Sequence, residues 1–90
     1  IMKYFVYMIL SKINSKYVSY VGYTNNLKNR LFSHNTSKGA KFTRGKKWKL
    51  IYSRTYYAKS EAMSEEFKLK KNYKKRDSIK KNFLIKNEIN

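Results

Sequence analysis

The chain has 90 residues, of which 22 are Lys or Arg and five are Asp or Glu, so its formal net charge is +17 at pH 7. A chain of this length forms one small domain, and its 41% hydrophobic and 17% aromatic residues can supply a core. Because it has no cysteine, disulfides and thiolate zinc sites are excluded, and no apolar run is long enough to span a bilayer. We therefore expect a soluble, intracellular domain, cytoplasmic or nuclear.

The excess of basic residues predicts a polyanionic partner, because so much positive charge repels itself. A biased codon usage would explain Lys in place of Arg, but not the shortage of acidic residues. Nucleic acid is the expected partner, and a role at a membrane surface is the weaker alternative.

Two runs near the N-terminus, residues 4–10 and 17–22, are rich in aromatic and β-branched residues and are separated by a polar segment. This pattern predicts a β-hairpin with its loop at residues 11–16. A symmetric loop would place Tyr7 opposite Tyr20, so that both phenols share one face of the sheet. Gly22 would then lie opposite Phe5, where a missing Cβ allows a helix or a ligand to approach closely.

A first helix is predicted from residues 24–26, which offer N-cap side chains, to about Asn35. Leu27, Leu31 and His34 form its apolar stripe. Arg30 and His34 are four residues apart, so both project from the side of the helix that faces the sheet.

The next segment, residues 36–47, is rich in lysine and glycine and carries Phe42 among its cations. Such a mixture suits phosphates and a stacked base, and a solvated basic loop is an equal alternative. The predicted nucleic-acid-binding residues are Lys28, Lys38, Lys41, Arg44, Lys46, Lys47, Lys70 and Lys71. The composition of residues 48–57 predicts a further strand, which we expect to be central in the sheet.

Ser60 is the expected cap of a second helix, in which Ala62, Glu66, Leu69 and Tyr73 fall on one stripe. Glu66 is thus a carboxylate among apolar neighbours, where it must be paired or bind a cation. A salt bridge to Lys70 is one reading and a metal site is the other. Glu65 is expected off the stripe in water. A third helix at about residues 77–87 would complete the core.

At this point the motifs resemble the GIY-YIG nuclease superfamily, and specifically its small stand-alone members. Phe5-Val6-Tyr7 and Tyr20-Val21-Gly22 resemble the two tripeptides that name the family. The similarity continues in order through Arg30-Leu31, His34-Asn35, the segment 38–45 and the helix that contains Glu66, and it covers residues 4–76. Phe5 replaces the glycine of the first tripeptide.

The resemblance implies an α+β fold with a three-stranded antiparallel sheet flanked by helices, in one domain over residues 1–90. It also implies metal-dependent hydrolysis of phosphodiester bonds. By position, Tyr7, Tyr20, Arg30 and His34 would be catalytic, and Glu66 would bind Mg²⁺ or Mn²⁺, hard ions that take oxygen ligands.

The chemistry assigns a role to each of these residues. Arg30 would hold a phosphate oxygen. Tyr7 is the expected general base, with Tyr20 orienting water or phosphate, although the two could exchange roles. Cationic neighbours should favour the Tyr7 phenolate, and a neutral His34 would accept a proton or position Tyr7.

The first hypothesis is therefore a metal-dependent endonuclease acting on DNA, with branched, flap and single-stranded substrates and RNA left open. The alternative is a basic nucleic-acid-binding module of the same fold with weak catalysis. A third hypothesis, that the chain is a structural protein of an assembly, is supported only by its charge. A protein partner or a homodimer is compatible with the sequence but is not specified by it.

Overall fold

The computed structural model describes residues 2–89. Its strands are β1 (Tyr4–Ile13), β2 (Lys16–Thr24) and β3 (Lys49–Tyr56). Its helices are α1 (Leu27–Asn35), α2 (Lys59–Lys71) and α3 (Tyr73–Ile89), with a short 3-10 helix, η1 (Lys41–Thr43), between α1 and β3. The strands are antiparallel, and the predicted α+β class is confirmed.

β1 is the central strand, because the sheet has the order β2-β1-β3. Its residues 6–11 are all buried, as expected of a strand that is covered on both faces. The expectation of a central strand at residues 48–57 is wrong. β3 lies at an edge, and its residues 53–55 are exposed.

The turn of the hairpin is tighter than predicted, because only Asn14 and Ser15 join β1 to β2. Asn14 adopts a φ of 57°, in the left-handed region that asparagine tolerates better than most residues. The turn centre moves by one residue, so Tyr7 pairs with Gly22 and Tyr20 pairs with Ile9. The predicted pairs of Tyr7 with Tyr20 and of Gly22 with Phe5 are therefore wrong.

The pairing is shifted by an even number of residues, which leaves each side chain on its predicted face. Tyr7 and Tyr20 therefore still share one face, as diagonal neighbours, and both belong to the cluster that packs around Ile9 and Trp48.

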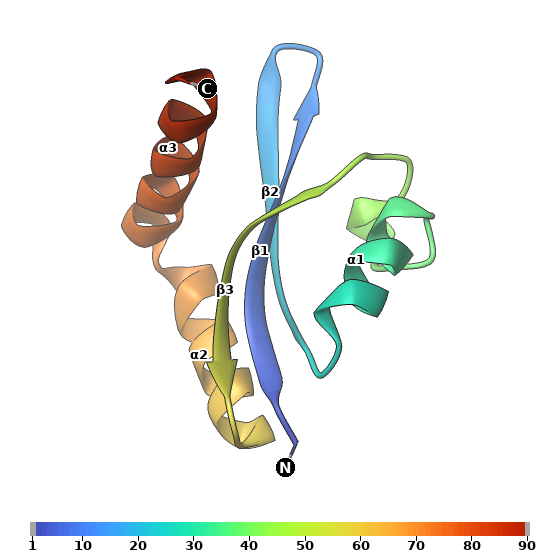
Figure 1. The fold of residues 1–90 in the computed structure, drawn as a ribbon, viewed down its shortest axis with the longest axis vertical. Helices are drawn as coiled ribbons and strands as arrows, with labels where there is room; N and C mark the ends of the chain where they lie inside the picture. Colours follow the sequence, from blue (N-terminus) through green and yellow to red (C-terminus); the bar gives the residue numbers. More distant parts are fainter. Residues whose placement is uncertain (1, 90) are drawn as a thin grey trace.

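Different helices cover the two faces of the sheet (Figure 1). α2 and α3 lie along one face, where Val6, Met8 and Val21 pack with Ala62 and Leu69. α1 and η1 lie on the other side, and Leu27 and Leu31 of α1 pack against Tyr7 and Ile9 there. Tyr7 therefore points from the central strand toward α1.

The start and end of α1 agree with the prediction. Asn26 is the N-cap, and its side-chain oxygen accepts a hydrogen bond from the Asn29 amide at 3.0 Å. The helix ends at Asn35. This local capping fixes where Arg30 and His34 lie on the helix.

α2 begins earlier than predicted, since its N-cap is Ala58 and no side chain caps it. The prediction of Ser60 as the cap is wrong, because Ser60 already lies in the first turn. The buried stripe holds at Ala62 and Leu69 but not at Tyr73, which is 68% exposed. The helix ends at Lys71, so Tyr73 begins α3 and no longer follows the α2 periodicity.

α3 is longer than the predicted segment 77–87, and it packs Ile79 against the core on the α2 side of the sheet. Within residues 2–89, no helix has both the length and the apolar character needed to cross a membrane.

A side-chain clamp joins the end of α1 to the start of β3. The Asn35 amide donates to the Trp48 carbonyl at 3.1 Å and accepts from the Trp48 amide at 2.6 Å. The indole N–H of Trp48 donates to the Thr43 carbonyl at 3.0 Å. These bonds hold α1, η1 and β3 together around the buried indole.

Gly22 has a specific steric role in this register. A Cβ at Gly22 would lie 2.5 Å from Oη and 2.8 Å from Cζ of Tyr7. Both groups are buried, so the ring has little room to move. The glycine therefore leaves the space that the Tyr7 phenol occupies.

We expect Gly22→Ala to lower the free energy of unfolding by about 1–3 kcal/mol through overpacking against Tyr7. Chemical denaturation measures the change. The matched control is the same substitution in a Tyr7→Leu background, whose shorter side chain removes the contact and most of the penalty. An equal penalty in both backgrounds would contradict the assigned contact.

Candidate active site

The Tyr7 phenol lies at the centre of a chain of hydrogen bonds that joins β1, α1 and η1. Tyr7 is 2% exposed, and its Oη lies 2.7 Å from Nε2 of His34, which is fully buried. The second ring nitrogen, Nδ1, lies 2.9 Å from Oγ1 of Thr43. Both nitrogens of the single histidine in the chain are therefore engaged.

The hydroxyl of Thr43 determines which nitrogen of His34 carries the proton. Thr43 Oγ1 donates its only proton to the Ala40 carbonyl at 2.8 Å. It therefore accepts from Nδ1–H of His34, which leaves Nε2 of the neutral imidazole as an acceptor. Tyr7 then donates its phenolic proton to Nε2.

Burial lowers the pKa of His34 below its ordinary value, and the charge of Arg30 acts in the same direction. The imidazole is therefore neutral at pH 7 and is able to accept a proton at Nε2. This agrees with the expectation of a neutral histidine in a basic setting.

Arg30 reaches the same phenol from the preceding turn of α1. Its Nε donates to Tyr7 Oη at 3.4 Å. Burial nevertheless raises the pKa of Tyr7, and the hydrogen bond and charge of Arg30 only partly oppose it. The expectation that cationic neighbours favour the phenolate is therefore wrong in its net direction: desolvation dominates, and Tyr7 is protonated at pH 7.

Tyr20 lies on the other side of His34. The centroids of the two rings are 5.2 Å apart, and the Tyr20 ring stacks on Phe42 at 6.2 Å with an interplanar angle of 20°. The phenols of Tyr7 and Tyr20 both raise the pKa of the Arg30 guanidinium, Tyr7 more strongly. Tyr20, Arg30 and Tyr7 are thus close enough to act on one another.

Glu66 comes from α2, beyond the other face of the sheet. Its side chain is 16% exposed and forms an ion pair with Lys70 at 3.4 Å. Its charge also raises the pKa of Tyr7, which places the carboxylate within electrostatic reach of the phenol. The salt bridge weighed as an alternative is therefore present, although it does not remove Glu66 from the neighbourhood of Tyr7. Glu65, expected in water, is one-third exposed and pairs with Lys68.

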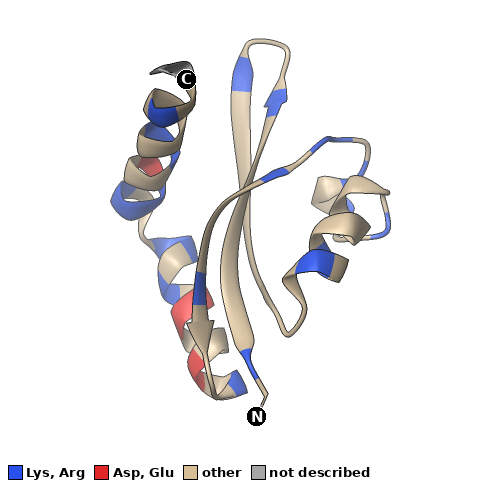
Figure 2. Ribbon diagram, viewed as in Figure 1, with Lys and Arg blue, Asp and Glu red and all other residues tan. Residues whose placement is uncertain are grey.

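The predicted nucleic-acid-binding residues form two groups. Five lie in the connection between α1 and β3, at Lys38, Lys41, Arg44, Lys46 and Lys47, and Lys28 is exposed on α1 nearby. Lys70 and Lys71 lie on α2, where Lys70 pairs with Glu66 and Lys71 lies 5.2 Å from the Phe67 ring centroid. All five acidic residues of the chain are on α2 or α3, so the α1 side carries cations alone (Figure 2).

A cleft of about 350 Å³ borders Arg30 and is lined by Tyr4, Tyr23, Thr24, Asn25, Arg30 and Lys59. It supplies an open space next to the guanidinium, and Lys59 adds a second cation to it. No motif in the sequence singles out Lys59.

Sequence reasoning also missed Thr43 and the clamp between Asn35 and Trp48. One signal was available for Thr43: a buried imidazole needs partners for both nitrogens, and a hydroxyl in the following loop can supply one. Nothing in the spacing of Asn35 and Trp48 indicates their paired hydrogen bonds.

The chain is similar to a known protein family over most of its length. The GIY-YIG catalytic domain family matches residues 3–82. The UPF0213 protein OB0043 of Oceanobacillus iheyensis is 44% identical over 69 residues, which cover 76% of this chain and 77% of that protein. The UPF0213 protein SH2523 of Staphylococcus haemolyticus is 41% identical over 69 residues, covering 76% and 80%.

Among solved structures, the solution NMR structure of the UPF0213 protein BH0048 from Bacillus halodurans is 32% identical, covers 87% of this chain and 82% of its own, and has a TM-score of 0.47. The match over residues 3–82 and the relatives at 41–44% identity establish that this chain belongs to the GIY-YIG catalytic domain family, a nuclease family.

Proposed function

We propose that this domain is a metal-dependent endonuclease that hydrolyses phosphodiester bonds of DNA. The observation that carries the proposal is the hydrogen-bonded chain from Arg30 through Tyr7 and His34 to Thr43, within electrostatic reach of the Glu66 carboxylate. A purely structural core has no need of a buried imidazole with a defined tautomer beside a guanidinium.

The tyrosine and the histidine act together as the base. Tyr7 is protonated, so it cannot remove a proton from water until it gives up its own. As the water transfers a proton to Tyr7 Oη, the phenolic proton moves to Nε2 of His34 over a contact of 2.7 Å. The hydroxide attacks phosphorus, the bond to the leaving sugar oxygen breaks, and that oxygen takes a proton from solvent. The imidazolium returns its proton to solvent afterwards.

The Arg30 guanidinium can donate hydrogen bonds to a substrate phosphate in addition to the one that it donates to Tyr7. Its Nε is directed to Tyr7 and Tyr20 is also within hydrogen-bonding reach of the guanidinium, so the remaining N–H donors would bind a non-bridging phosphate oxygen. The same contact fixes the phosphate relative to the tyrosine that activates the water. Tyr20, whose ring centroid lies 5.2 Å from that of His34, would orient the water or the phosphate.

The donor set at Glu66 fits Mg²⁺ or Mn²⁺. Within residues 2–87, no cluster of three or more His, Cys, Asp or Glu side chains could hold a metal ion. We take Glu66 as the protein ligand of the proposed ion. Mg²⁺ accepts such a site because it keeps several waters and takes other ligands from substrate phosphates. A bound divalent ion would polarise the phosphoryl group and stabilise the leaving oxygen.

The surface around α1 is suited to the DNA backbone. Every charged residue from Lys28 to Arg54 is basic, and most of them are exposed. Phosphate contacts from these side chains would position the strand without reading its sequence. The cleavage experiment below decides whether the substrate is branched, flap or single-stranded DNA, and RNA can be tested in the same way.

One observation favours the second candidate, a binding module with weak catalysis. The ion pair between Glu66 and Lys70 gives the carboxylate a partner other than a metal. The pair is partly exposed, however, and exposed pairs contribute little, so substrate and metal can displace Lys70.

We expect Glu66→Gln to reduce Mg²⁺-dependent cleavage by roughly 10³-fold, because the metal loses its protein ligand. DNA affinity in EDTA should stay the same or rise slightly, since a negative charge is removed. Cleavage of labelled single-stranded, duplex, flap and branched DNA, with Mg²⁺, Mn²⁺ or EDTA, measures the effect.

Glu65→Gln is the matched control, because it removes the same charge from the neighbouring position of α2 and should cleave like the wild type. Tight binding without cleavage by the wild-type protein, on all substrates and in either metal, would establish the binding module instead. Equal cleavage by both variants would refute the metal role of Glu66.

The stability of the domain should fall as the pH falls below about 6.5. The unfolded imidazole binds a proton near that pH, whereas the pKa of folded His34 is lower. The unfolded state therefore binds more protons in this window, and the free energy of unfolding declines by at most about 1.4 kcal/mol per pH unit. Denaturation between pH 5 and 8 should show this slope in the wild type and a smaller one in His34→Gln. Equal slopes would contradict the lowered pKa.

Thr43 should act as a positioning residue for His34. Thr43→Val removes the acceptor for Nδ1–H, which releases the tautomer, and should lower cleavage by about 10- to 100-fold. Thr43→Ser keeps the hydroxyl and should restore activity. Nitrogen NMR of the single imidazole reports the tautomer directly, so a protonated Nδ1 that persists in the valine variant would disprove the role.

A further inference from the structure

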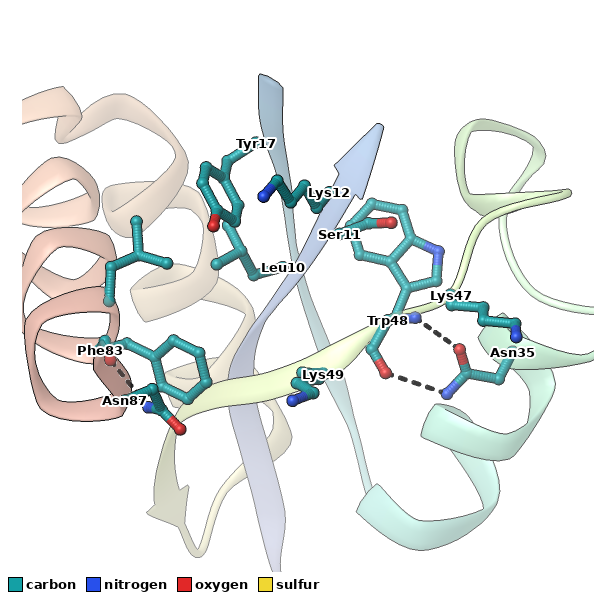
Figure 3. A pocket seen from close by; sticks show the side chains of 11 residues that line it. Leu10, Ser11, Lys12, Tyr17, Asn35, Lys47, Trp48, Lys49, Phe83 and Asn87 are labelled. Atoms are coloured by element: carbon teal, nitrogen blue, oxygen red, sulfur yellow. Dashed lines mark hydrogen bonds between the residues drawn. The ribbon is translucent and has the colours of Figure 1, made fainter. Parts of the chain in front are cut away.

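A larger pocket lies at the other end of the sheet from the Arg30 cleft. Its volume is about 720 Å³, within the range of small-molecule sites. The hairpin forms one wall, α3 the second, and the start of β3 the third (Figure 3). The proposed catalytic residues do not line it, so the proposed function leaves it unexplained.

The lining combines aromatic rings with cations. Tyr17 is on β2, Phe83 is on α3 and Trp48 lies just before β3, and Lys12, Lys47 and Lys49 lie around them. Trp48 is buried at the wall of the pocket, so Tyr17 and Phe83 provide the accessible rings. The described lining residues include no acidic side chain. Aromatic faces for bases and cations for phosphates are the combination that single-stranded nucleic acid needs.

The walls of the pocket are held in place by contacts already in the structure. The Asn35 clamp fixes the backbone of Trp48, and the indole N–H is bonded to Thr43. On the hairpin, Lys12 Nζ lies 5.5 Å from the Tyr17 ring centroid, so cation and ring are presented together. A phosphate on Lys12 would thus place its base beside the phenol.

The pocket is linked to the catalytic residues along two elements. Asn35, at its border, directly follows His34 in α1. On β1, Lys12 is five residues beyond Tyr7, which corresponds to about 17 Å along a strand, and this odd spacing turns the two side chains to opposite faces of the sheet. That distance is too long for one nucleotide and suits a strand that continues for a few nucleotides beyond the bond that is cut.

We propose that this pocket binds an unpaired base of the DNA strand that occupies the active site, with the flanking phosphates on Lys12 and Lys49. The identity of the occupant rests on the proposed function. A base in a duplex is stacked and paired and cannot enter such a pocket without leaving the helix. The pocket therefore selects substrates with a single-stranded segment next to the cleavage site.

The test uses the single tryptophan of the chain, which lines the pocket. A thymidine oligonucleotide of about ten nucleotides should change Trp48 fluorescence in a saturable manner in EDTA, with Glu66→Gln protein, so no cleavage is required. Tyr17→Thr keeps a β-forming residue but removes the ring, and should weaken binding about fivefold or more. Lys12→Ala should reduce the slope of log affinity against log salt by about 0.7.

Lys16→Ala is the matched control, since it removes an exposed hairpin lysine that does not line the pocket and should leave the fluorescence change intact. The proposal fails if the oligonucleotide binds by anisotropy without affecting Trp48, or if Lys12 and Tyr17 variants bind like the wild type. Equal fluorescence titrations with duplex DNA, or tighter ones with an acidic peptide or RNA, would also overturn it.

These outcomes are independent of cleavage. A protein that cuts DNA with no response from Trp48 refutes the pocket alone. A saturable response from Trp48, with no cutting of any substrate by the wild type, refutes the proposed function alone.

Discussion

The hydrogen bond between the buried Tyr7 phenol and His34 is the constraint on which the rest of the site depends. A phenol and an imidazole without solvent must satisfy each other, and the second imidazole nitrogen then needs Thr43. Gly22 supplies the space for the phenol, and the Asn26 cap begins the helix that carries the imidazole. A substitution at any of these positions is therefore expected to alter the position or the hydrogen bonds of Tyr7 Oη.

Burial also decides how the tyrosine can react. Desolvation raises the pKa of Tyr7 more than Arg30 lowers it, so a free phenolate is not the resting state. The same burial lowers the pKa of His34 and keeps its Nε2 open. The two shifts run in opposite directions, so they keep the phenol a donor and Nε2 an acceptor at pH 7.

The acidic and the basic residues of the molecule lie in different regions of the fold. Acidic residues lie only on α2 and α3, where Glu65, Glu66 and Asp77 are paired with lysines. All charged residues of α1 and of the loop before β3 are basic. The Arg30 cleft and the larger pocket lined by Lys12, Tyr17 and Trp48 both border this surface. One strand of nucleic acid could therefore contact both without meeting a carboxylate among the residues that line them.

Local features of the sequence were enough to predict the strands, the start of α1 and the family. Aromatic and β-branched runs specify the strands, Asn26 specifies the start of α1, and the ordered motifs identify the family and bring Tyr7, Arg30 and His34 together. These features depend on neighbours a few residues away, so they can be read without a structure.

Only the tertiary structure decided the register, the strand order and the partners of the buried groups. The register goes with the two-residue turn at Asn14 and Ser15, and the edge position of β3 depends on its pairing with a distant strand. Thr43 reaches His34, and the Trp48 indole packs with Tyr7 and Ile9, because the chain between α1 and β3 folds back through η1. Contacts of this kind join residues that are remote in sequence, and no periodicity or capping rule encodes them.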